Sequence, residues 1–214
     1  MKQEIPHGSL SAQAGTMLSA RPEFDAIAAW VHPGAQVLDL GCGDGSLLRF
    51  LTEVRGAFGY GVEIADAKVL ASVRNRVNVL QSDLESGLAG FESGSFDYVI
   101  LSQTLQAVRH TEQIIGEMLR VGRQAIVTFP NFGYWGHRLQ VLLGHMPVSP
   151  TLPYEWYNTP NVHLFTIGDF EDFCAKQGIR ILERVVLDHG RTVSVLPSLM
   201  GSLAVYRFDR GPQP

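Results

Sequence analysis

One short glycine-rich segment has residue types and spacing suited to a nucleotide-like ligand. Gly41, Gly43 and Gly45 recur at every second position, and glycine lets the backbone turn sharply and a ligand approach without meeting a Cβ atom. Asp39 stands two residues before the first glycine, and Asp44 lies inside the turn. Two carboxylates would repel the pyrophosphate of a dinucleotide, and the spacing departs from the G-x-G-x-x-G pattern of dinucleotide sites. These carboxylates suit a ligand with a cationic amino group and a sulfonium.

Two further acids end the strands that we expect next along the chain. Glu63 follows Gly45 by 18 residues, and a carboxylate at such a position can accept both hydroxyls of a ribose. Asp83 can reach an adenine amino group, with Leu84 against the ring. The carboxyl ends of parallel strands border the ligand crevice of an open α/β sheet. We therefore expect Asp39, Glu63 and Asp83 to face one crevice.

A regular alternation of apolar segments and helical patterns predicts the elements that carry these residues. Strands are expected at residues 36–40, 60–64, 77–80, 96–101 and 124–129. Between them, apolar residues with helical spacing predict helices near residues 46–54, 65–74 and 111–121. Strands that are apolar on both faces and separated by helices indicate a mostly parallel sheet covered on both sides. Parallel connections are right-handed, so the predicted sheet is doubly wound.

The C-terminal part of the chain follows a different pattern. Thr166 is expected to cap a helix that runs to about Gln177, with Gly178 as its C-terminal stop. Strands at 179–187 and 202–208 have no helix between them, which indicates an antiparallel hairpin at the sheet edge. The predicted fold class is therefore α/β: a Rossmann-like, doubly wound, seven-stranded and mostly parallel sheet with a late antiparallel strand.

Composition limits the classes of function. A chain of 214 residues with 45% hydrophobic residues fits one domain, residues 1–214, with a sizeable core. The net charge of −4 argues against a surface that tracks nucleic-acid phosphates. Two cysteines, the lack of a signal-peptide pattern and the short apolar runs predict a soluble, cytoplasmic protein without a membrane segment. Residues 1–20 are expected to form an N-terminal arm.

Residues 130–165 interrupt the alternation with an insertion rich in proline and aromatic residues. A connection of this length is usually functional. One interpretation is that the insertion simply caps the core. The other is that it forms a lid or a surface for a partner protein, because aromatic residues dominate interface cores.

Residues 37–45, together with Glu63 and Asp83, resemble the class I S-adenosylmethionine-dependent methyltransferases. The resemblance implies that fold and a site for S-adenosylmethionine or S-adenosylhomocysteine. It assigns the methionine part to the glycine turn and Asp39, the ribose to Glu63 and the adenine to Asp83. The expected cofactor-binding residues are Asp39, Gly41, Cys42, Gly43, Gly45, Glu63, Ile64, Asp83, Leu84 and Ser102.

Further segments resemble a narrower group, the MetW family of methionine biosynthesis proteins, over nearly the whole chain. These segments are residues 97–106, 129–133, 138–140, 146–148 and 153–161, together with His163. The resemblance implies an accessory protein that acts with the homoserine O-acyltransferase MetX. The acylation chemistry would then belong to the partner, and the sequence contains no Gly-x-Ser-x-Gly nucleophile elbow of its own.

A catalytically active small-molecule methyltransferase is the alternative function. The segment after the fourth expected strand, residues 102–105, lacks the Asn/Asp-Pro-Pro pattern of many amino-group methyltransferases. Oxygen methylation usually needs a base or a metal ion, and His110, His137 and His163 are the candidate bases. A lone histidine more often has a packing role, so no catalytic residue is assigned. Both functions remain open at the level of sequence.

Overall fold

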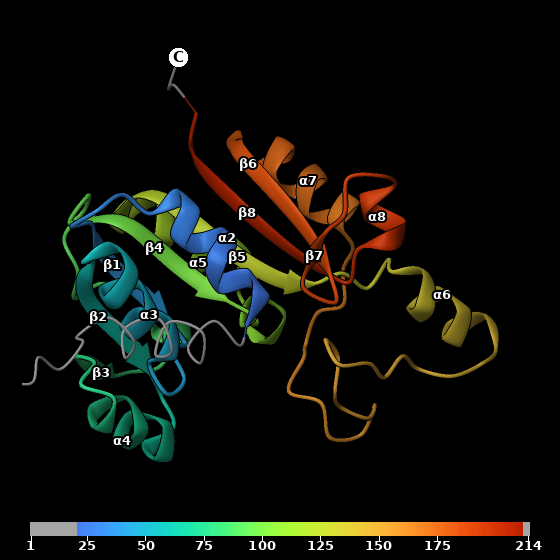
Figure 1. The fold of residues 1–214 in the computed structure, drawn as a ribbon, viewed down its shortest axis with the longest axis horizontal. Coiled ribbons are helices and arrows are strands. Elements are labelled where there is room, and N and C mark those ends of the chain that lie inside the picture. Colours follow the sequence, from blue (N-terminus) through green and yellow to red (C-terminus); the bar gives the residue numbers. More distant parts are fainter. Residues whose placement is uncertain (1–20, 212–214) are drawn as a thin grey trace, which may run out of the picture.

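A single sheet of eight strands, in the order β3-β2-β1-β4-β5-β8-β6-β7, runs through the protein (Figure 1). A computed structural model describes residues 21–211, and the arm expected at residues 1–20 lies outside the described residues. The first five strands are parallel, and β8 joins them antiparallel between β5 and β6. The strands are β1 (Gln36–Leu40), β2 (Phe58–Glu63), β3 (Val79–Gln81), β4 (Phe96–Ser102), β5 (Gly122–Pro130), β6 (Ile179–Asp188), β7 (Arg191–Thr192) and β8 (Leu203–Arg210).

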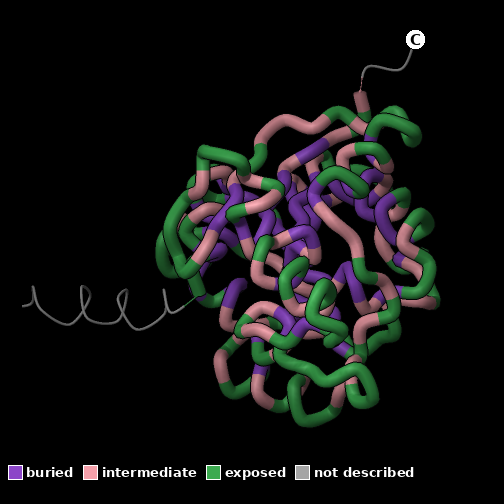
Figure 2. Tube along the Cα trace, turned by 90° about the vertical axis from the view of Figure 1, so that its right-hand side faces the viewer, coloured by how far each residue is buried: buried purple, intermediate pink, exposed green. Residues whose placement is uncertain are grey.

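Helices cover both faces of the sheet, as the alternating pattern predicts. Val37 and Tyr98 pack on one face with α2 and α3, whereas their neighbours Leu38 and Val99 pack on the other face with α5 and α7. The buried residues therefore form two clusters, one on each face of the sheet. Figure 2 shows the buried segments in the interior of the molecule. The helices are α2 (Pro22–Trp30), α3 (Ser46–Arg55), α4 (Asp66–Arg74), α5 (Thr111–Val121), α6 (Trp135–Leu142), α7 (Ile167–Lys176) and α8 (Pro197–Met200), with short 3-10 turns η1 (Leu84–Ser86) and η2 (Leu105–Ala107).

The predicted doubly wound sheet with a late antiparallel hairpin is confirmed, but the expected count of seven strands is wrong. The eighth strand is β7, which has two residues and pairs with the end of β6. The chain reverses at His189 and Gly190, whose φ angles are 44° and 77°. A segment of two exposed residues has no apolar pattern, so nothing in the sequence marks it as a strand.

The local signals around α7 are confirmed. Thr166 accepts a hydrogen bond from the backbone of Asp169, and the Asp169 side chain accepts one from the backbone of Thr166, which forms a capping box. Gly178, with a φ of 66°, follows the helix in the left-handed conformation that favours glycine. These contacts position the end of the insertion against the sheet.

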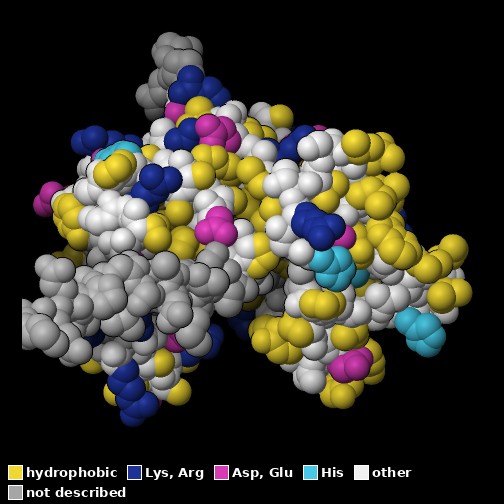
Figure 3. All heavy atoms as spheres, viewed as in Figure 1, with side chains coloured by type: hydrophobic (Ala, Val, Ile, Leu, Met, Phe, Trp, Pro, Cys, Tyr) yellow, Lys and Arg dark blue, Asp and Glu magenta, His cyan; other side chains and the backbone are white. Residues whose placement is uncertain are grey.

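The insertion extends away from the sheet and contains α6 (Figure 1). Many of its apolar side chains face solvent, and Figure 3 shows them gathered on this side of the molecule. We call them the insertion surface: Trp135, Leu139, Val141, Leu142, Leu143, Met146, Val148, Tyr154, Trp156, Tyr157, Val162 and Leu164. Among the helices of residues 21–211, none is long and apolar enough to cross a membrane.

Candidate functional site

The glycine turn follows β1 directly, at the carboxyl end of the parallel strands. Gly41, Gly43 and Gly45 have φ angles of 67°, 60° and 76°, all in the left-handed region. Residues with a Cβ atom rarely adopt this conformation, so the three glycines are required by the backbone itself. A Cβ atom on Gly41 would also lie 2.9 Å from Thr104 Oγ1. The sequence prediction of a sharp glycine turn is therefore confirmed.

Glu63 ends β2 with its carboxylate directed at the glycine turn. Its Oε2 atom accepts a hydrogen bond of 3.0 Å from the backbone N–H of Gly43. Its Oε1 atom accepts bonds of 3.0 Å from the N–H groups of Ile64 and Ala65. Glu63 is only 5% exposed. These three bonds hold the strand end against the turn.

Asp39 is deeply buried next to the turn, with only 2% of its surface exposed. Burial raises the pKa of Asp39 from 3.8 to about 7; the nearby positive charge of Arg21 lowers this pKa, and the charge of Glu63 raises it. The site thus contains a carboxyl whose pKa is raised by burial and would be lowered by a cation bound beside it.

The remaining expected residues lie around the same edge of the sheet in more open positions. Asp83 is exposed, and its Oδ1 atom accepts a bond of 2.9 Å from the N–H of Glu85, a bond that caps the start of η1. Ile64 is exposed beside Glu63. Ser102, at the end of β4, shares a hydrogen bond of 3.1 Å with Thr128. The strand order β3-β2-β1-β4 brings these strand ends together.

Cys42 has a packing role in the turn. Its side chain is buried against Gly61 of β2, where an added Cβ atom would lie 2.3 Å from the sulfur. Burial, the largest cause, and the charge of Asp39 raise the pKa of the Cys42 thiol to about 12. The thiol is therefore neutral and unreactive at physiological pH.

The structure adds contacts from α2 that sequence reasoning missed. Glu23 is buried and accepts hydrogen bonds from Arg21 and from the side chain of Gln103, which follows β4. Gln103 has a φ of 51°, an uncommon conformation for a residue other than glycine. The signal for α2 was present in the sequence, because Pro22 at the first helical turn and two acids beside it are typical of a helix start.

These residues border a cavity of about 430 Å³ at the end of β4. Its walls include Glu23, Gln103, Tyr134, Ser149 and Asp188, which come from α2, the insertion and the end of β6. Gln103, which lines the cavity, directly follows Ser102, the last residue of β4.

Of the three candidate histidines, His110 and His163 line a common cavity, which His137 does not line. His137 is buried, with Nδ1 3.1 Å from the carbonyl oxygen of Asn131 and Nε2 2.8 Å from Ser149 Oγ. Burial lowers the pKa of His137, so the neutral ring holds the insertion together. His110 and His163 instead border an 840 Å³ cavity between α5 and α7.

Comparison with known proteins identifies relatives over most of the chain. The sequence profile of the family described as "Methionine biosynthesis protein MetW" matches residues 21–208. A bifunctional methionine biosynthesis protein MetXA/MetW from Rhodopirellula baltica is 38% identical over an alignment of 194 residues that covers 84% of this chain. The chain spans only 31% of the length of that relative.

Several solved structures with a similar fold are S-adenosylmethionine-dependent methyltransferases. A S-adenosylmethionine-dependent methyltransferase from Thermotoga maritima, a possible histamine N-methyltransferase, aligns with a TM-score of 0.66, 17% identity and 92% coverage of both chains. Another from Mesorhizobium loti aligns with a TM-score of 0.67, 16% identity, and coverage of 90% of this chain and 100% of the other. The magnesium protoporphyrin IX methyltransferase of Synechocystis, solved with S-adenosylhomocysteine, aligns with a TM-score of 0.63, 18% identity, and coverage of 99% and 90%. The fold is that of class I methyltransferases.

Proposed function

Because the chain belongs to the MetW family of methionine biosynthesis proteins, we propose that it binds S-adenosylmethionine and supports or regulates the homoserine O-acyltransferase MetX. The observation that carries the binding proposal is the left-handed turn through Gly41, Gly43 and Gly45, with Asp39 and Glu63 packed around it. This turn lies at the carboxyl ends of the parallel strands, where open α/β sheets bind their ligands.

The residues around the turn fit the proposed cofactor. The turn and Asp39 receive the methionine part, whose ammonium compensates the buried carboxylate. Glu63 receives the ribose. Each carboxylate oxygen has two lone pairs, so the three amide bonds leave one acceptor position on Oε2 for a hydroxyl. A second hydroxyl bond requires the bond from Gly43 to open, which would free that N–H for the ligand.

The adenine end of the proposed site is formed by Asp83 and Leu84, with Ile64 beside the ribose position. Asp83 is exposed and one of its oxygens already accepts the N–H of Glu85, so its other oxygen is available for an amino group. Cys42 and Ser102 complete the site from the turn and the end of β4. When bound, the cofactor supplies either an activated methyl group or, for an accessory protein, a signal of its own concentration.

Two observations support the proposed partner: the name of the relative, and the exposed apolar side chains of the insertion. The Rhodopirellula baltica protein is named as a bifunctional MetXA/MetW protein. A segment similar to this chain makes up 31% of its length. The insertion surface exposes aromatic side chains such as Trp156, which is 72% exposed. Large exposed apolar patches are typical of protein interaction sites.

Cofactor binding is tested by calorimetric titration of the wild-type protein with S-adenosylhomocysteine. Gly43→Val should abolish binding, because it adds a side chain where the backbone must approach the ligand. Gly34→Val is the matched control: Gly34 has a φ of 72°, with no atom within 4 Å of an added Cβ, as at Gly43, but it lies outside the turn. Equal loss in both variants would mean that strain, not the site, causes the effect.

The accessory function is tested by co-expression with the homoserine O-acyltransferase. Pull-down and acyltransferase activity are measured with and without S-adenosylmethionine. We expect a complex and a change of activity with cofactor. Because coupling in binding is reciprocal, the partner should change cofactor affinity by the same factor. The regulatory proposal is wrong if cofactor alters neither the affinity of the complex nor the activity.

A small-molecule methyltransferase is the second candidate function, supported by the cavity of about 430 Å³ beside the end of β4. The test is transfer of a radiolabelled methyl group to a metabolite pool, with Asp39→Ala as the negative control. Label transfer that depends on Asp39 would support this function. Absence of transfer, with stimulation of the acyltransferase retained, would exclude it.

A further inference from the structure

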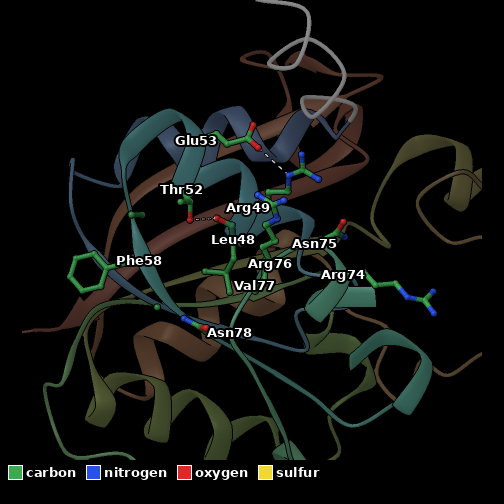
Figure 4. A pocket seen from close by; sticks show the side chains of 12 residues that line it. Leu48, Arg49, Thr52, Glu53, Phe58, Arg74, Asn75, Arg76, Val77 and Asn78 are labelled. Atoms are coloured by element: carbon green, nitrogen blue, oxygen red, sulfur yellow. Dashed lines mark hydrogen bonds and ion pairs between the residues drawn. The ribbon is translucent and has the colours of Figure 1, made fainter. Parts of the chain in front are cut away.

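A second cavity lies behind the glycine turn, between α3, the start of β2 and the segment that joins α4 to β3 (Figure 4). Its volume is about 640 Å³, and neither Asp39 nor Glu63 lines it. None of the residues expected to bind the cofactor lines this cavity. Asn75, which does line it, donates through Nδ2 a bond of 2.8 Å to the carbonyl oxygen of Asp44 in the turn. The cavity is therefore distinct from the proposed cofactor site.

Positive charge dominates the lining of this cavity. Arg49, Arg74 and Arg76 line it, and Glu53 is the one acid among the described lining residues. Glu53 pairs with Arg49 at 3.0 Å. Within residues 21–211, neither Arg74 nor Arg76 has a carboxylate within ion-pair distance. This local excess of positive charge occurs in a chain whose net charge is −4.

The side chain of Arg76 runs toward Arg49 in Figure 4, whereas Arg74 extends away. The backbone of Arg76 is also unusual, with a φ of 60°. It directly follows Asn75, the C-cap of α4, at a position where helices usually have glycine. Residues other than glycine that are held in such conformations gather at functional sites. An arginine here points to a role for its guanidinium.

We propose that this cavity binds a small molecule that carries a phosphate or diphosphate group, held between Arg49 and Arg76. Guanidinium groups match phosphate oxygens with paired hydrogen bonds. The cavity is larger than a diphosphate requires, and the apolar side chains of Leu48, Phe58 and Val77 in its lining accommodate an organic part. This site does not depend on the proposed function of the crevice.

The test is calorimetric titration with inorganic pyrophosphate at low ionic strength. We expect saturable binding with a dissociation constant below about 1 mM, which weakens as salt is added. Arg76→Gly removes the guanidinium at a position whose backbone suits glycine. It should weaken binding by at least about tenfold without lowering the melting temperature. Arg49→Gln should also weaken binding, whereas Arg191→Gln, at an exposed arginine of β7, should not.

Unchanged affinity in Arg76→Gly, or an equal loss in Arg191→Gln, would overturn the proposal, as would the absence of saturable binding. The titration is repeated with S-adenosylhomocysteine. Displacement of pyrophosphate by this compound, together with no effect of Arg76→Gly, would place the anion in the cofactor crevice and refute the second site. Pyrophosphate binding through Arg76 in a protein that fails to bind S-adenosylhomocysteine would instead refute only the proposed cofactor function.

Discussion

Replacement of Asp39 by asparagine should stabilise the protein increasingly as the pH rises toward neutrality. The carboxyl is buried, and burial raises its pKa from 3.8 to about 7. The folded state therefore holds this proton more tightly than the unfolded state does. The stability that the protonated carboxyl contributes is complete below about pH 4 and is lost as the pH rises through about 7.

The size of the effect follows from the shift. A shift from 3.8 to about 7 is about 3 pKa units, and about 1.4 kcal/mol per unit gives an upper limit of about 4 kcal/mol. Asparagine keeps the shape of the side chain and removes the charge. Its buried amide adds a cost that does not depend on pH, so the informative quantity is how the stability difference between the two proteins changes with pH.

The assay is urea unfolding of both proteins at several pH values from about 5 to about 8, followed by tryptophan fluorescence. The difference in free energy of unfolding should grow by about 2–3 kcal/mol in favour of Asp39→Asn across this range. The same change at Asp172, an exposed carboxyl of α7, is the control. A difference that stays constant with pH would refute the argument that burial governs the ionisation of Asp39.

Three other substitutions test separate parts of the structure. Glu63→Ala should weaken S-adenosylhomocysteine binding by roughly 1–3 kcal/mol, the usual cost of a lost hydrogen bond to a charged group, and calorimetry at fixed salt measures it. Trp156→Ala should spare cofactor binding but weaken association with the acyltransferase in pull-down; retained association would favour the interpretation that the insertion only caps the core. Asn131→Ala should lower the free energy of unfolding by about 2–4 kcal/mol in urea titration, because the buried amide bonds the backbone of Ser198, Gly201, Gly133 and Ile167. A loss below about 1 kcal/mol would show that these bonds are replaced by water or by relaxation.

Much of the candidate site was predictable because its determinants are local. Three alternating glycines can form a left-handed turn wherever they occur, and an acid at the end of a parallel strand lies at the crevice edge. The capping signals of Thr166 and Gly178 are equally local. Strand β7 was not predictable, because two exposed residues carry no pattern.

The tertiary structure alone decided the chemistry of these residues. The raised pKa of Asp39 depends on burial by elements distant in sequence, and Glu23 meets Gln103 across 80 positions. The cavity between Arg49 and Arg76 arises only when α3 packs beside the segment after α4. Sequence determined which side chains stand at each strand end, since backbone conformation and strand polarity are local properties. Solvent exclusion and charge neighbours are collective properties, so only the assembled fold determined how those side chains ionise and what they can bind.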